Sequence, residues 1–146
     1  EILKEIRSYE AVEDYTNETY LKLIHDNYYP EHVLRIPAED WPEDVSNAFA
    51  EINFPIYLKM QGPSEFGIVG NASLKDWDVT QELNKISVPF LSIGAQHDTM
   101  DPKQMEWMAN EVQNGSYLHC PNGSHMAMWD DSENYFNGLI SYIKNL

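Results

Sequence analysis

The sequence predicts an α/β fold in which a helical block precedes a region of alternating strands and helices. Apolar residues recur at intervals of three and four before residue 60, which is typical of amphipathic helices. Two short apolar segments, 88–93 and 116–120, are typical of strands, and a helical pattern lies between them. A polar loop follows each strand. We therefore expect a helical region over residues 1–67 and a strand-containing core region over residues 68–146.

The helical region contains three predicted helices. The first covers residues 2–12, and the second covers residues 19–28 with Asn17 as its cap and Pro30 at its end. The third passes through Ala48 and Phe49. No alternating strand pattern precedes Gly62, so this region has no sheet of its own. Such a block suits a lid over an active site, and an independent helical bundle is the alternative.

In the core region, predicted strands alternate with predicted helices. The first strand is expected to stop at Gly94, and Asp101-Pro102 begins the next helix with a cap and a proline at its first position. Asn114-Gly115 ends that helix before the second strand. The stretch from Asp130 to Glu133 resembles a capping box for a last helix that reaches the end of the chain. Its inward face is predicted to contain Tyr135, Phe136, Leu139, Ile140 and Ile143.

An acid and a histidine follow the two predicted strands. Asp98 lies in the loop after the first strand, and His125 lies just past the Asn122-Gly123 turn after the second. Open α/β sheets place their chemistry at the carboxyl edge, where both loops would meet. We therefore expect Asp98 to orient His125, the general base of a hydrolytic triad. Asp101 is the competing acid, but its position as a helix cap already explains it.

Six motifs occur together: Gly94–Asp98, Asp101-Pro102, Gly123–Met126, Gln61–Phe66, Lys75–Asp78 and Met128–Asp131. The first three resemble the C-terminal half of an α/β-hydrolase, and the last three narrow the resemblance to the proline iminopeptidase (prolyl aminopeptidase) family, which includes the tricorn-interacting aminopeptidases. The resemblance implies the C-terminal part of an α/β-hydrolase fold with a helical cap, and release of N-terminal residues, preferably proline. The order of acid before histidine agrees with this fold.

The resemblance also assigns a substrate-binding residue. Glu65 stands where the family binds the free α-amino group of the substrate, and a carboxylate offers that cation a charge-assisted hydrogen bond. The sequence departs from the tricorn-interacting relatives at Thr99, where they have a second amine-binding glutamate after the triad aspartate. Either another acid substitutes for it, or Glu65 alone holds the amine.

The nucleophile is missing from the pattern. The elbow sequence Gly-x-Ser-x-Gly does not occur, and the string from Gly62 to Gly67 has its second glycine one place too late. We expect the serine on an N-terminal part of the same enzyme, which would be the partner of this chain. The alternatives are another α/β-hydrolase, such as an esterase, lactonase or epoxide hydrolase, or a non-catalytic fragment.

Composition narrows the possible partners and cofactors. The net charge of −15 argues against nucleic acid. Solubility alone can explain an acidic surface, which would also attract cationic ligands such as a peptide with a free amino terminus. Cys120 is the single cysteine, which we expect to be buried, and no apolar run has the length of a membrane span. The histidines lack the spacing of a zinc site, so we expect no metal and no cofactor. A cytoplasmic location is expected, with a secreted or periplasmic location as the alternative.

Overall fold

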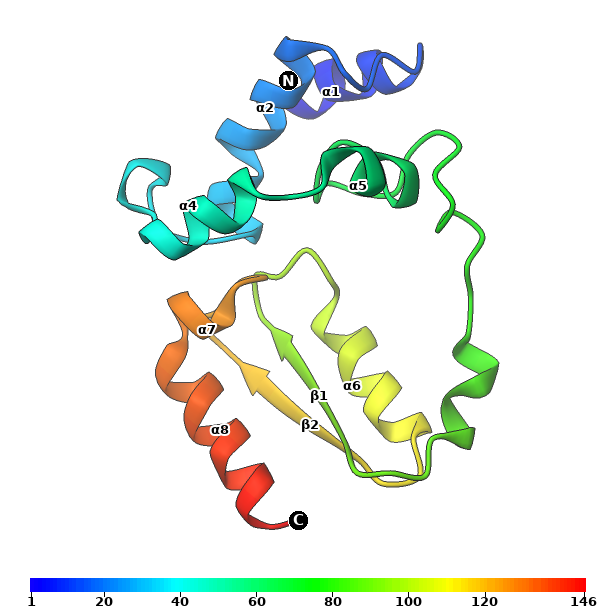
Figure 1. Ribbon diagram of the computed structural model, residues 1–146, viewed down its shortest axis with the longest axis vertical. Coiled ribbons are helices and arrows are strands. Elements are labelled where there is room, and N and C mark those ends of the chain that lie inside the picture. Colours follow the sequence, from blue (N-terminus) through cyan, green and yellow to red (C-terminus); the bar gives the residue numbers. More distant parts are fainter. The chain divides into compact units, whose positions relative to one another are not determined.

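Two units divide the chain in the computed structural model, which describes residues 1–146. The first, which we call the helical unit, contains Glu1–Pro30 and Ile36–Trp77. The second, the strand unit, contains Glu31–Arg35 and Asp78–Leu146. Figure 1 shows the helices of the first unit and the two arrows of the second.

The helical unit contains no strand, as the sequence predicted for its first 60 residues. The side chain of Asn17 accepts a hydrogen bond from the Thr19 N–H at 2.9 Å, which confirms the predicted cap. Asn53 caps a helix that the sequence did not predict. The elements are α1 (Ile2–Glu10), α2 (Glu18–Asn27), η1 (Ala38–Asp40), α4 (Glu43–Ala50) and α5 (Phe54–Met60), while the short α3 (Tyr29–His32) spans the passage between the units.

The core of the helical unit lies between its first two helices. Ile6 from α1 packs with Tyr20 and Ile24 from α2, and all three are buried. Apolar side chains at intervals of three and four on both helices produce this contact. Burial, together with the nearby Glu10 carboxylate, raises the pKa of Tyr20 to about 12, so its hydroxyl stays protonated at neutral pH.

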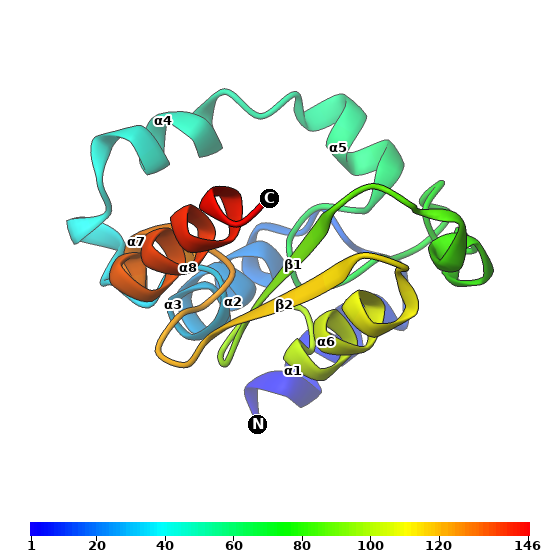
Figure 2. The same cartoon turned by 90° about the horizontal axis from the view of Figure 1, so that it is seen from below.

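The strand unit is built around two parallel strands, β1 (Phe90–Ala95) and β2 (Gly115–Cys120), which pair in register from Phe90↔Gly115 to Ala95↔Cys120. The helix α6 (Pro102–Glu111) connects them and packs on both strands. The helix α8 (Ser132–Lys144) packs on β2 from the opposite side (Figure 2). A 3₁₀ helix, η2 (Thr80–Lys85), and the short α7 (Ala127–Asp130) complete the unit.

Small residues allow α8 to approach the strand pair. Ala95, Cys120 and Ala127 form a buried cluster against which Tyr135 packs. The prediction that Cys120 is buried is confirmed, and burial raises the pKa of its thiol to about 11. The thiol is therefore protonated at neutral pH and a poor nucleophile.

The predicted end of the first strand is wrong. The strand begins at Phe90 rather than Val88 and continues through Gly94 to Ala95. Pro89 has no N–H to contribute to the ladder. Gly94 is a packing residue rather than a terminator, because a Cβ there would lie 2.7 Å from the hydroxyl oxygen of Tyr117.

Two expectations about α8 are also wrong. Asp131 is its N-cap and makes no side-chain capping hydrogen bond, so the predicted capping box does not form. Asp130 instead accepts hydrogen bonds from the N–H groups of Arg35 and Ser124. Phe136, Ile140 and Ile143 are 47–57% exposed rather than inward, because the sheet that α8 covers has only two strands.

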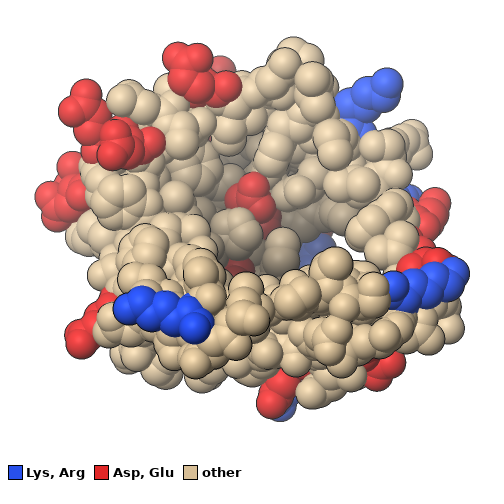
Figure 3. Space-filling view, turned by 60° about the horizontal axis from the view of Figure 1, so that its bottom comes forward, with Lys and Arg blue, Asp and Glu red and all other residues tan.

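The charge of the chain is dispersed on the face that Figure 3 draws, where acidic side chains occupy several separate positions. None of the helices combines the length and the apolar character that crossing a membrane requires.

Candidate active site

The carboxyl ends of β1 and β2 bring two loops together. The last pair of the ladder is Ala95↔Cys120, so both strands end at the same level. Beyond it, the Gln96 N–H donates to the Cys120 carbonyl and the His97 N–H donates to the Gly123 carbonyl, each at 3.0 Å. The loops are therefore joined before they reach the functional side chains.

Asp98 and His125 are in direct contact. The Nδ1 atom of His125 lies 2.9 Å from Oδ1 of Asp98. A carboxylate can only accept, so Nδ1 carries the proton and donates it, and in the neutral imidazole the lone pair is then on Nε2. The side chain of Asp98 is 10% exposed and that of His125 is 32% exposed. The acid is thus enclosed while the base remains accessible.

Two further groups hold the Asp98 carboxylate. The hydroxyl of Thr99 donates to Oδ1 at 3.2 Å, and the Met100 N–H donates to the same oxygen at 3.1 Å. Burial raises the pKa of Asp98, but the hydrogen bonds from His125, Met100 and Thr99 and the attraction of the imidazole outweigh it. The pKa of Asp98 therefore lies below its usual value, and the carboxyl is ionised at neutral pH.

Thr99 was not identified as part of this site by sequence reasoning, which noted only the absence of a glutamate there. Its hydroxyl oxygen lies 3.3 Å from Nδ1 of His125 as well as within reach of Asp98. The residue therefore contacts both members of the pair.

A buried serine and an aspartate position the turn that carries His125. Ser124 is 0% exposed, and both its N–H (3.0 Å) and its hydroxyl donate to the Asp130 carboxylate. The hydroxyl oxygen of Ser124 also lies 2.9 Å from the Val33 carbonyl oxygen, so its single proton is shared between the two acceptors. This is the role that Asp130 takes in place of the predicted capping box. The backbone of His125 is consequently fixed from the residue that precedes it.

A cavity of about 200 Å³ adjoins the acid–base pair. Asp98, His125 and Ser124 contribute its polar walls, and Ile93, Ala95, Met100, Met105, Ala127, Met128 and Tyr135 contribute the remainder. The pair therefore borders a space with mostly apolar walls, within the strand unit.

Asp101, the competing acid, has the structural role expected for it. Its side chain accepts a hydrogen bond from the Lys103 N–H at 2.9 Å and caps α6. The imidazole of His125 bonds Asp98, so the geometry assigns the two aspartates to different roles, as predicted from the sequence.

Glu65 lies in the helical unit, in the loop after α5. Its carboxylate accepts hydrogen bonds from the Tyr57 hydroxyl at 2.6 Å and from Nε2 of Gln61 at 3.3 Å, while its N–H donates to the Tyr29 hydroxyl at 3.2 Å. Burial, followed by the hydrogen bond to Glu65, raises the pKa of Tyr57 far above its usual value. The hydroxyl of Tyr57 and the amide of Gln61 therefore hold the Glu65 carboxylate in place, and both of these donors are uncharged.

An aromatic cavity of about 250 Å³ adjoins the two tyrosines that contact Glu65. Its walls are Tyr29, Phe49, Ala50, Ile52, Phe54, Tyr57 and Pro63, all in the helical unit. Sequence reasoning did not identify this cavity, because its residues come from four separate segments of the helical unit.

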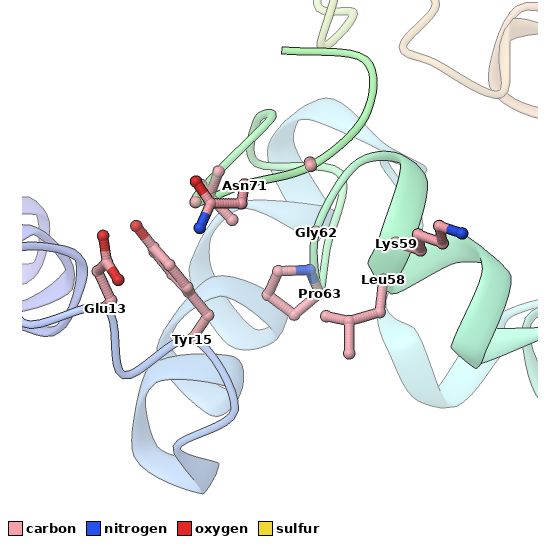
Figure 4. Close-up of a pocket in the computed structure, with 10 residues that line it drawn as sticks. Glu13, Tyr15, Leu58, Lys59, Gly62, Pro63 and Asn71 are labelled. Atoms are coloured by element: carbon pink, nitrogen blue, oxygen red, sulfur yellow. The ribbon is translucent and has the colours of Figure 1, made fainter.

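Another cavity of the helical unit, of about 330 Å³, shows no comparable arrangement. Figure 4 shows Glu13, Tyr15 and Asn71 on one side of it and Leu58 on another, while the amine of Lys59 points away. We assign no chemistry to this cavity.

The fold and the acid–histidine pair define the chain as the C-terminal part of an α/β-hydrolase: in this class an acid and then a histidine follow parallel strands, after the nucleophile in chain order. Solved structures agree. The crystal structure of VinJ superimposes with a TM-score of 0.86 at 30% identity, and covers 99% of this chain and 48% of its own. A proline iminopeptidase from Mycobacterium smegmatis gives 0.77 at 26% identity, with 96% and 46% covered.

Over its whole length the chain is similar to proline iminopeptidases. It is 49% identical over 146 residues to the proline iminopeptidase of Flavobacterium johnsoniae and 45% identical over 146 residues to that of Elizabethkingia meningoseptica. Each match covers 100% of this chain and 48% of the relative, so the chain spans about half the length of the curated relatives it matches. No family model matches the sequence.

Proposed function

We propose that this chain supplies the acid and base of a serine hydrolase that releases N-terminal residues, preferably proline, from peptides. The contact between Nδ1 of His125 and Oδ1 of Asp98 is the observation that carries this proposal. The names of its relatives supply the substrate class.

In this proposal His125 transfers protons and Asp98 orients it. Nε2 of His125 removes the proton from the attacking serine and later donates a proton to the leaving amine. Asp98 keeps the proton of the neutral imidazole on Nδ1 and stabilises the imidazolium that forms. Water then hydrolyses the acyl-enzyme, with His125 again as the base.

We assign the serine and the oxyanion hole to the N-terminal part of the same enzyme, the partner of this chain. The absence of Gly-x-Ser-x-Gly from residues 1–146 and the greater length of the relatives support this assignment. Backbone N–H groups of an oxyanion hole typically contribute about 3 kcal/mol each to catalysis. The two halves would therefore be inactive apart.

We further propose that the helical unit is the substrate-selecting cap, with Glu65 bound to the free α-amino group. The neutral donors around Glu65 leave its negative charge available to a cation. The neighbouring aromatic cavity is suited to a small apolar ring such as that of proline.

Hydrolysis of proline 2-naphthylamide by the complete enzyme tests the proposal. We expect turnover by the wild type and its loss in His125→Ala, whereas Asp101→Asn, which keeps a capping side chain, serves as the matched control. An enzyme that cleaves carboxylic esters or epoxides but not this substrate would show that the site belongs to another α/β-hydrolase activity.

A further inference from the structure

A short segment between two helical stretches of the sequence belongs to the strand unit. We call Glu31–Arg35 the strap. Its residues Val33 and Leu34 are 0% exposed. The Met126 N–H donates to the Val33 carbonyl at 2.9 Å, and the Arg35 N–H donates to the Asp130 carboxylate at 3.1 Å. The strap is thus packed against the turn that carries His125.

His32 of the strap contacts both loops of the acid–base pair. Its carbonyl accepts a hydrogen bond from the His125 N–H at 3.0 Å. Its ring atom Nδ1 lies 2.9 Å from the carbonyl oxygen of His97. A carbonyl can only accept, so Nδ1 of His32 carries a proton and donates it.

The His97 carbonyl belongs to the peptide group that leads into Asp98. Fixing this carbonyl fixes the plane of the peptide and hence the direction in which the Asp98 side chain leaves the backbone. The hydrogen bond on the other side of this peptide, from the Asp98 N–H to the Ala95 carbonyl, is longer, at 3.3 Å. The ring of His32 therefore makes the shorter of the two hydrogen bonds that orient the acid.

We propose that His32 is a positioning residue that sets the geometry between Asp98 and His125, with its ring holding the acid loop and its carbonyl holding the base. The expected effect of His32 on turnover rests on the proposed function. The hydrogen bonds of His32 themselves involve only residues of the strand unit.

Three variants of the complete enzyme separate the hydrogen bond of the ring from its bulk. His32→Phe keeps a ring without the donor. His32→Asn places its amide nitrogen as many bonds from Cα as Nδ1 of histidine and so keeps a donor. His25→Asn is the control, because His25 is a half-exposed histidine of the helical unit.

Turnover of proline 2-naphthylamide should be high in variants that keep a side-chain hydrogen-bond donor at position 32 and low in those that lack it. We expect kcat of His32→Phe to fall roughly tenfold, the equivalent of one net hydrogen bond, with KM within about twofold of the wild type. His32→Asn should recover kcat to within about threefold, and His25→Asn should match the wild type. A wild-type kcat in His32→Phe, or equal losses in the Phe and Asn variants, would overturn the proposal.

A second readout does not depend on turnover. The NMR resonance of the Nδ1 proton that His125 shares with Asp98 should move or broaden in His32→Phe and return in His32→Asn. If the wild type fails to cleave the substrate, the proposed function fails, and this resonance still decides the role of His32. If thermal unfolding shows that His32→Phe does not fold, His32→Gln, whose donor is displaced by one bond, takes its place with the same expected losses.

Discussion

Replacing Asp98 with asparagine should remove most of the turnover while leaving the site intact. The hydrogen bonds from Nδ1 of His125, the Met100 N–H and the Thr99 hydroxyl all end on Oδ1, so an amide oxygen placed there still accepts them and keeps the proton of the neutral ring on Nδ1. The neutral amide removes the negative charge that stabilises the imidazolium formed during catalysis.

The separation of 2.9 Å gives the size of this effect. With an effective dielectric constant of about 20, the attraction between the carboxylate and the imidazolium is at most about 6 kcal/mol. That corresponds to a fall in kcat of up to ~10⁴-fold. Initial rates with proline 2-naphthylamide measure it, and KM should stay near the wild-type value. An Asp98→Asn enzyme that keeps more than about a tenth of the wild-type kcat would refute the reasoning.

Three more predictions concern substrate binding, acid stability and packing. Glu65→Gln should raise KM for a substrate with a free amino terminus by about 10- to 100-fold with little change in kcat, because one charge-assisted hydrogen bond is weakened; steady-state kinetics measures both constants. The lowered pKa of Asp98 adds stability that is complete above its unfolded-state pKa of about 4 and is lost as pH falls through the lower folded-state pKa, so urea unfolding between pH 6 and pH 2 should show a smaller loss in Asp98→Asn. Gly138→Ala should lower the free energy of unfolding by about 1–3 kcal/mol, because the new Cβ would lie 2.4 Å from Cδ1 of Leu118, whereas Gly67→Ala, with no atom within 4 Å, is the matched control in the same urea titration.

The sequence allowed prediction of those features that depend on local patterns. The helices of the first 60 residues follow from apolar residues at intervals of three and four, and the caps Asn17 and Asp101 follow from side chains that bond their own helix. The meeting of Asp98 and His125 follows from topology, because parallel neighbours end at the same edge of the sheet.

Features that depend on distant partners were not predictable. Asp130 fits the pattern of a capping box, but Ser124 and Arg35, the latter 95 residues away in sequence, provide better partners for its carboxylate. Gly94 looks like a strand end, because a sequence pattern does not distinguish a terminating glycine from one that Tyr117 approaches closely. The role of the strap is hidden for the same reason, since its hydrogen bonds reach residues 65–95 positions away.

Covalent labelling of the complete enzyme with a fluorophosphonate, followed by peptide mass spectrometry, tests the central claim most directly. The reagent forms an adduct only with a serine that a neighbouring base activates. We predict one adduct in the wild type, on a serine outside residues 1–146, and labelling slowed by several orders of magnitude in His125→Ala. An adduct on a serine of this chain, or equal labelling rates in the wild type and His125→Ala, would contradict the account.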